Sequence, residues 1–245
     1  MRTAVTGLVW VCLGGALISG SQEPAPALGT TDAHVMQFLD ADDVPLVSYR
    51  AVRYLEAAAR NGRMKATLTA VTSLDPARGF QYDIVEETGS GVIRSKVLRA
   101  ALEAERRAWN ADDRQRAALN RANYDFGPEE RLDSGLVRIA IRPRRSDSMV
   151  VEGTILVTDD RADLIAVEGR LVKRPSFWTR RVDVIRRYSR IAGVRVPVSM
   201  ESTADVLLAG LCTFSMQYEY EAINDGPLPT PAPVAARSSG TGARH

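Results

Sequence analysis

The feature that most constrains the fold is an alternation of apolar and polar side chains through the second half of the chain. It is clearest over 212–221, where Cys, Phe, Met, Tyr and Tyr alternate with Thr, Ser, Gln, Glu and Glu. A period of two places one apolar row on one face of a strand. Strands are predicted over 64–73, 80–87, 136–142, 149–157, 163–173, 181–191, 194–203 and 212–221.

Short connections between these segments favour an antiparallel meander, and its apolar face must be covered. Apolar residues at helical spacing predict a helix over about 45–60. A second apolar stripe predicts a helix from an N-cap at Ser90 to Trp109, and a short polar helix is expected around 112–119. The predicted fold class is α+β, a curved antiparallel sheet or unclosed β-barrel covered by two or three helices.

The register of the sheet bears on possible chemistry. Hairpins symmetric about Arg145 and Asp160 would place the apolar residues of three strands on one face. The same register puts Glu152 opposite Glu168 and next to Arg138. Two facing carboxylates could serve as an acid–base pair in a hydrolase. A solvated outer face balanced by arginines explains these residues more simply, and we favour that interpretation.

A repeated Val-Glu-Gly triplet places glycines at 153 and 169, at matching positions of neighbouring strands. Glycine pairs of this kind permit a bulge or a sharp bend. We therefore expect the sheet to curl toward a half-barrel.

The N-terminus has the features of an export signal. Arg2 is followed by an uncharged apolar stretch up to Ile18, and small residues precede the polar segment after Ser21. Cleavage near Ser21 predicts an exported, periplasmic protein, with an uncleaved membrane anchor as the alternative. Cys12 lies too near the start for lipidation, so a lipoprotein is not expected.

The remaining chain divides by composition. Pro-, Ala- and Gly-rich segments at both ends cannot bury enough apolar surface to offset their ordering entropy. The predicted organisation is a signal peptide over 1–21, a disordered linker over 22–32, a single domain over 33–224 and a disordered tail over 225–245.

Composition excludes several classes of function. The chain has 32 Lys and Arg against 30 Asp and Glu, so its net charge of +2 gives no reason to expect a nucleic-acid partner. It has 2 His and 2 Cys, and His34 and His245 are both expected in tails. Cys212, alone after cleavage, is interpreted as a small buried hydrophobe. No catalytic motif is present, and we expect no enzyme activity, no cofactor and no metal.

Seven arginines between 174 and 195 form the strongest local charge feature. Interleaved with aromatic residues, this arginine stripe could dock an anionic surface or an envelope protein, through Arg180, Arg181 and Arg187. Alternatively, these arginines lie on strand edges and an outer face, where they discourage aggregation.

The segment 163–224 resembles the C-terminal sheet of the outer-membrane lipoprotein carriers (LolA/LolB-like proteins), in an uncharacterised exported bacterial subgroup. The similarity rests on the VEGRL strand at 167–171, the strand–turn–strand over 191–197 and the FSMQY strand at 214–218. The resemblance implies an unclosed antiparallel barrel over helices, with a hydrophobic cavity that shields acyl chains.

Two functional hypotheses follow. In the first, a monomeric exported carrier or chaperone holds an acyl chain or lipidated partner between sheet and helices, with peripheral membrane contact possible. The residues expected to line that site are Val151, Ile155, Val167, Phe214, Met216 and Tyr218. In the second, the core is filled, and the protein is an interaction or sensor module that docks an envelope partner through the arginine stripe.

Overall fold

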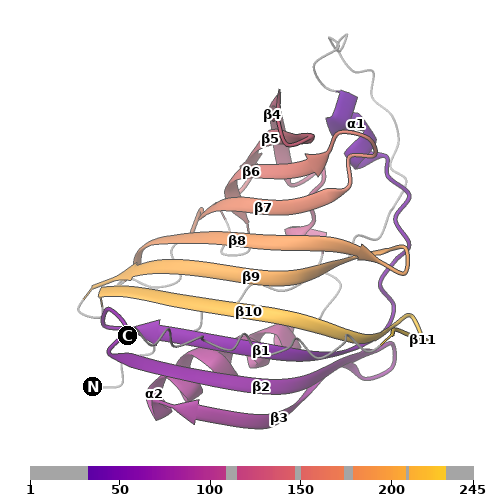
Figure 1. Cartoon of the computed structure of the whole chain (residues 1–245). Coiled ribbons are helices and arrows are strands. Elements are labelled where there is room, and N and C mark those ends of the chain that lie inside the picture. The colour runs from indigo at the N-terminus through magenta and orange to yellow at the C-terminus, as the bar shows by residue number, and fades with distance from the viewer. Residues whose placement is uncertain (1–32, 109–114, 147–149, 174–178, 208–209, 230–245) are drawn as a thin grey trace, which may run out of the picture.

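The computed structural model describes residues 33–108, 115–146, 150–173, 179–207 and 210–229. The predicted signal peptide, the linker and most of the predicted tail lie outside these residues. An 11-stranded antiparallel sheet dominates the described chain, in the order β3-β2-β1-β10-β9-β8-β7-β6-β5-β4, with β11 paired to β10 (Figure 1). Because β3 and β4 stand at opposite edges of this path, the sheet is not closed. The predicted fold class is confirmed.

The strands are β1 (Tyr49–Ala59), β2 (Met64–Asp75), β3 (Gly79–Gly89), β4 (Tyr124–Arg131), β5 (Leu136–Pro143), β6 (Val151–Thr158), β7 (Leu164–Leu171), β8 (Thr179–Ile191), β9 (Val194–Val206), β10 (Gly210–Ile223) and β11 (Gly226–Pro227). All eight strands predicted from the alternation are present. The short β11 lies just beyond the predicted domain end at residue 224.

One helical stretch, 91–108, follows β3 and comprises α2 (Gly91–Ile93), the π-helical turn η2 (Arg94–Leu98) and α3 (Arg99–Ala108). We call it the cover helix, because it packs on one face of β1, β2 and β3. In Figure 1 it lies behind these strands. That face is the inner face of the sheet, and the opposite one is the outer face. The helix predicted from Ser90 is confirmed up to residue 108; Trp109 lies outside the described residues.

The helix predicted over 45–60 is wrong, because most of this segment is strand β1. Tyr49, Ala51, Leu55 and Ala57 alternate on the inner face and are buried. Arg53 stands in the middle of this row, also buried. A charged residue at a core position disguised the two-residue period, so the apolar residues around it were assigned to a helical period instead.

Besides β11, helix α1 and strand β4 were not predicted. Helix α1 (Ala33–Leu39) contains His34, which is buried rather than part of a tail. Strand β4 was missed because Pro128 and a register shift between Phe126 and Glu129 interrupt its alternation. Of the short polar helix expected around 112–119, residues 115–117 are helical, and 112–114 lie outside the described residues.

The predicted register of two hairpins is wrong by an even number of residues. Arg138 pairs with Leu156, and Glu152 pairs with Arg170 rather than Glu168. A shift of even length keeps side chains on their predicted faces. The exception lies beyond the bulge, where Val157 pairs with Leu164, so that Leu164 takes the inner position predicted for Ile165. The apolar residues of β5, β6 and β7 therefore still share the inner face, whereas the facing carboxylates do not exist.

Gly153 and Gly169, the glycines predicted to permit a bulge or a sharp bend, pair directly. A Cβ atom on Gly153 would lie 2.1 Å from the carbonyl oxygen of Glu168, and one on Gly169 would lie 2.3 Å from that of Glu152. Any side chain at either position would collide with backbone. The bulge in this hairpin falls elsewhere, between Leu156 and Val157.

Candidate functional site: the inner face and its cover helix

The inner face carries an apolar surface that crosses most of the sheet. Register pairs connect Ile155 to Val167 and Met200 to Met216, with Arg186 of β8 between Val167 and Met200. All six residues predicted to line a ligand site lie on this face, and none is more than 6% exposed. They form two groups, one on β6 and β7 and one on β10, separated by β8 and β9.

A buried ion pair fastens the cover helix to this face. Arg53 of β1 meets Glu105 of α3 in a bidentate contact, with Nη1 2.5 Å from Oε2 and Nη2 2.9 Å from Oε1. Each residue is only 1% exposed. Arg53 Nη2 also donates to the Tyr49 hydroxyl at 2.5 Å. The pair is the main polar contact between this helix and the strands beneath it.

Aromatic rings enclose the guanidinium of Arg53. Its central carbon lies 4.6 Å from the ring centre of Tyr218 and 5.0 Å from that of Phe80. Such faces attract a cation electrostatically. Burial lowers the pKa of Arg53, but the charge of Glu105 and the neighbouring phenols raise it more, and the net pKa lies well above its ordinary value. Arg53 therefore remains a charged group inside the core.

The residues of this pair were missed, although the sequence contained a signal for each. Arg53 falls at the inward position of an alternating row, two residues from both Ala51 and Leu55. Glu105 follows Ala101 by four residues, within the apolar stripe of the helix. Charged residues at apolar positions of two elements that must pack together predict a buried pair.

Two smaller polar contacts hold the same helix at its sides. Glu87 of β3 accepts hydrogen bonds from Arg94 at 2.7 Å and from Arg99 at 2.6 Å. The Tyr82 hydroxyl donates to Glu103 at 3.2 Å. Arg99 and Glu103 are much more exposed than the Arg53–Glu105 pair, so these contacts are open to water.

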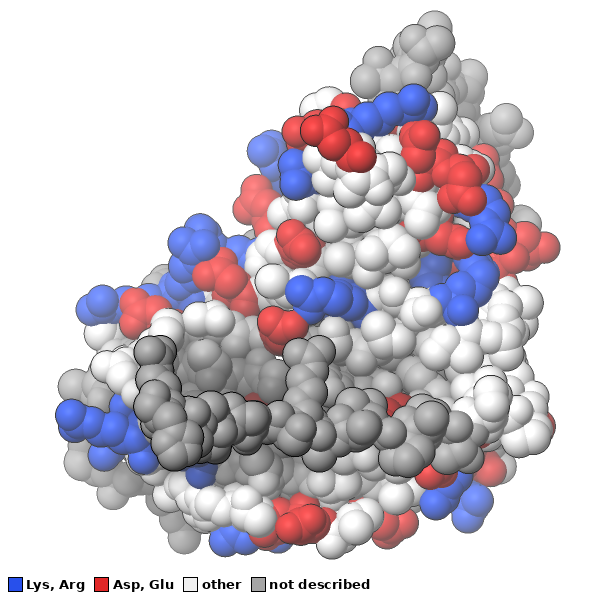
Figure 2. All heavy atoms as spheres, in the orientation of Figure 1, with Lys and Arg blue, Asp and Glu red and all other residues white. Residues whose placement is uncertain are grey.

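The arginines proposed for docking lie on the outer face, each beside an acid. Arg180 is 3.9 Å from Asp205, Arg181 is 2.5 Å from Asp183, and Arg187 is 2.5 Å from Glu201. These arginine side chains are roughly half exposed. Figure 2 shows positive and negative groups intermixed over the visible surface.

Glu152 also lies on the outer face, 3.5 Å from Arg142. It lines a shallow charged hollow of about 330 Å³ together with Gly169, Arg170, Arg181 and Asp183. The neighbouring strand presents Arg170 opposite Glu152, which removes the arrangement that an acid–base pair with Glu168 would need. Glu152 therefore lies on a solvated face next to arginines, as the simpler interpretation predicted.

His34 and Cys212 are the histidine and the cysteine in the described part of the chain. His34 lies between Glu129 and Asp159, with Nδ1 2.7 Å from a Glu129 oxygen. Burial lowers the pKa of His34, but Glu129 and Asp159 raise it above its ordinary value. Burial raises the pKa of the half-buried Cys212 thiol, which disfavours a reactive thiolate. Within the described ranges, no three His, Cys, Asp or Glu residues are grouped to hold a metal.

No model of a protein family and no curated protein matches this sequence. In the described part of the chain, no helix is long and apolar enough to cross a membrane.

Two solved structures are similar to the chain. A LolA superfamily protein from Nitrosomonas europaea is 14% identical with a TM-score of 0.37, over 82% of this chain and 96% of that one. A DUF1329 family protein from Desulfovibrio piger is 11% identical with a TM-score of 0.35, over 77% and 89%. The first carries the name of the superfamily that the sequence was predicted to resemble. At these identities and TM-scores, neither likeness bears on what this chain binds.

Proposed function

We propose that this chain is an exported, non-enzymatic binding protein that holds a hydrophobic ligand between the inner face and the cover helix. An acyl chain or a lipidated partner fits this role, as in a lipoprotein carrier or chaperone of the cell envelope. The observation that carries the proposal is the arrangement of the cover. A broad apolar face spans the sheet, while the cover helix packs mainly on β1, β2 and β3 and is fastened there by one buried ion pair.

A cover held in this way can separate from the sheet. Its apolar contacts are non-directional, so a hydrophobic ligand can replace them at little cost in free energy. The Arg53–Glu105 pair is directional, and it must break before the helix moves away. Because the contacts of Glu87 and Glu103 at the sides of the helix are open to water, the buried pair should dominate the cost of opening.

The centre of the inner face has the adaptability that a chain-like ligand requires. Met200 and Met216 pair across β9 and β10, and both are buried. Methionine side chains are unbranched and polarisable, so they repack easily around ligands of different shape. We propose that Met200 lines the site together with the six predicted residues, of which Met216 is one.

Native mass spectrometry of gently purified protein tests the proposal. A co-purifying lipid, or an adduct formed on adding a fatty acid, is the expected result. A fatty acid at 100 times its Kd should add about 2.7 kcal/mol of stability, which corresponds to roughly 5–10 °C in Tm. No lipid together with no shift in Tm would contradict the proposal.

A matched pair of variants on β10 tests whether the ligand that raises Tm binds at the inner face. Met216→Gln changes a buried inner-face residue, and Thr213→Gln changes an exposed one on the same strand. We expect the first to lose most of the ligand-induced shift, measured from its own Tm, and the second to keep it. Equal shifts in both variants would place the ligand elsewhere.

A second candidate is an interaction or sensor module that docks an envelope partner through the arginine stripe. It is favoured by the tight burial of the six lining residues, which fits a filled core. Replacing Arg180, Arg181 and Arg187 with Glu should then abolish recovery of the partner without lowering Tm. If the partner is still recovered with this variant, the arginine stripe is only a solvated face.

A further inference from the structure

Residues 33–48, which we call the strap, run along one end of the sheet, from α1 beside β4 to the start of β1 (Figure 1). In an antiparallel sheet, alternate connections fall at the same end. The turns after β6, β8 and β10 therefore share an end with the first residue of β1. We call it the strapped end. The strap contacts each of these three turns.

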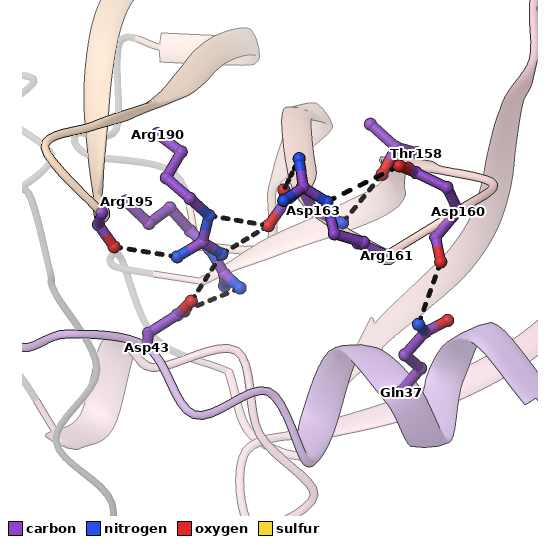
Figure 3. Close-up of polar contacts among 9 residues, drawn as sticks. Gln37, Asp43, Thr158, Asp160, Arg161, Asp163, Arg190 and Arg195 are labelled. Atoms are coloured by element: carbon purple, nitrogen blue, oxygen red, sulfur yellow. Dashed lines mark hydrogen bonds and ion pairs between the residues drawn. The ribbon is translucent and has the colours of Figure 1, made fainter.

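The first attachment is to the turn between β6 and β7. His34 Nε2 lies 3.1 Å from a carboxylate oxygen of Asp159. Gln37 Nε2 donates to the carbonyl oxygen of Asp160 at 3.1 Å (Figure 3). These two residues lie on α1, so the helix is held against this turn.

The second attachment is to the turn between β8 and β9, and it is made of charges. Asp43 lies 2.7 Å from Arg190 and 2.7 Å from Arg195, which come from the two strands of that hairpin (Figure 3). Arg190 also pairs with Asp163 at the start of β7. Arg195 stacks over Phe38 of α1, with 5.1 Å between the guanidinium and the ring centre. One aspartate of the strap thus joins both strands of the β8–β9 hairpin, and Arg190 links it to the turn before β7.

The third attachment is to the turn after β10. The side-chain oxygen of Asn224 accepts hydrogen bonds from the backbone N–H groups of Val47 at 2.8 Å and Ser48 at 3.2 Å. Its Nδ2 donates to the carbonyl oxygen of Pro45 at 2.8 Å. The Ser48 hydroxyl also donates to Asp225 at 3.0 Å.

We propose that the strap keeps this end of the inner face shut, so that a hydrophobic ligand enters and leaves at the opposite end. This inference rests on the proposed function. Three turns held to one segment cannot spread apart independently. The cover helix begins at that opposite end, where the Ser90 N–H donates to the carbonyl oxygen of Lys65 at 2.8 Å.

Strand β2 provides a matched pair of positions for a test. Asn61 lies in the turn before it, at the far end, and Ala77 lies in the turn after it, at the strapped end; both are exposed. The 12 residues of β2 separate them by about 40 Å. A small fluorophore is attached to a cysteine at either position, in a full chain that carries Cys12→Ser and Cys212→Ser. The probe is stearate with a nitroxide quencher at carbon 5, beside the carboxylate.

Because a carboxylate is costly to bury, it should remain at the entrance. We expect at least twofold stronger quenching at position 61 than at position 77, and a smaller ratio when the nitroxide is at carbon 16. Binding of the same probe is first measured by native mass spectrometry. No adduct would contradict the proposed function, and the inference with it. An adduct with equal or reversed quenching would contradict the inference alone.

Loosening the strap provides the second arm. The double variant Asp43→Asn/Asn224→Gly removes the charged attachment and the amide attachment together. We expect quenching at position 77 to rise by at least twofold. Glu201→Gln, which removes an outer-face ion pair, is the matched control and should leave the ratio unchanged. An unchanged ratio in the double variant would show that the strap does not close this end.

Discussion

Two arginine–glutamate pairs of this protein have the same short contact and opposite surroundings. Arg53–Glu105 joins β1 to the cover helix, and Arg187–Glu201 joins β8 to β9, each at 2.5 Å. The side chains of the first pair are 1% and 2% exposed, those of the second 46% and 52%. Water solvates the outer pair when it separates, but the buried guanidinium would be left with the Tyr49 hydroxyl, the Met216 sulfur and the aromatic rings around it. The cost of separation therefore comes from burial and not from distance.

The largest effect should follow from breaking the inner pair on one side. Glu105→Leu leaves Arg53 charged and uncompensated in the core, and we expect a loss of about 3–5 kcal/mol in the free energy of unfolding. Urea unfolding measures it. The double variant Arg53→Met/Glu105→Leu should recover most of that loss, because an apolar pair can fill the same space. If Glu105→Leu proved no less stable than Arg187→Gln, the claim that burial decides the weight of the two pairs would be refuted.

Loosening the strap should change the free energy of unfolding by an amount between those of the two ion pairs. Asn224→Gly removes three hydrogen bonds to the strap, while glycine accepts the positive φ of 48° at this position. We expect the free energy of unfolding to fall by about 1–2 kcal/mol. Amide exchange over 40–48 should accelerate, with exchange in the cover helix unchanged as the control. Equal acceleration in both regions would mean that strap and helix do not respond separately.

His34 adds a pH dependence to the strap. Its raised pKa means that folding favours the protonated imidazole, which Glu129 and Asp159 face, with Arg131 3.3 Å from Asp159. This contribution is complete below pH 6.5 and is lost as the pH rises through the raised pKa. Stability should therefore decline above pH 6.5 more steeply than in His34→Gln. Parallel pH profiles of the two proteins would contradict this assignment.

The smallest effect should come from the outer pair. Arg187→Gln should change the free energy of unfolding by no more than about 0.5 kcal/mol, because both side chains are half exposed and screened by salt. Adding 0.5 M NaCl should reduce even this difference. A loss comparable with that of Glu105→Leu would show that exposure does not decide the weight of these pairs.

The sequence predicted the sheet well, because period-two alternation survives wherever one face is apolar and the other solvated. Up to the bulge between Leu156 and Val157, the hairpin registers were shifted by an even number of residues, since alternation fixes the face of each side chain but not its partner. The geometry of the connecting loops decides the partner, and composition does not encode it.

The residues of the candidate site escaped prediction for a related reason. Arg53 and Glu105 each place a charge at an apolar position of their own element. Burial of either charge is tolerated because the two form an ion pair across the core. The strap depends in the same way on contacts between Asp43 and residues almost 150 positions later. Such pairings belong to the tertiary structure, so a local period cannot show them.

Amide hydrogen exchange on adding a fatty acid tests most directly whether the ligand is held between helix and sheet. We predict changed exchange over 91–108 and in the inner-face strands β1 and β10. The strap should be unaffected, and Met216→Gln should abolish the change. Unaltered exchange in the cover helix, with fatty acid shown by native mass spectrometry to be bound, would contradict this account.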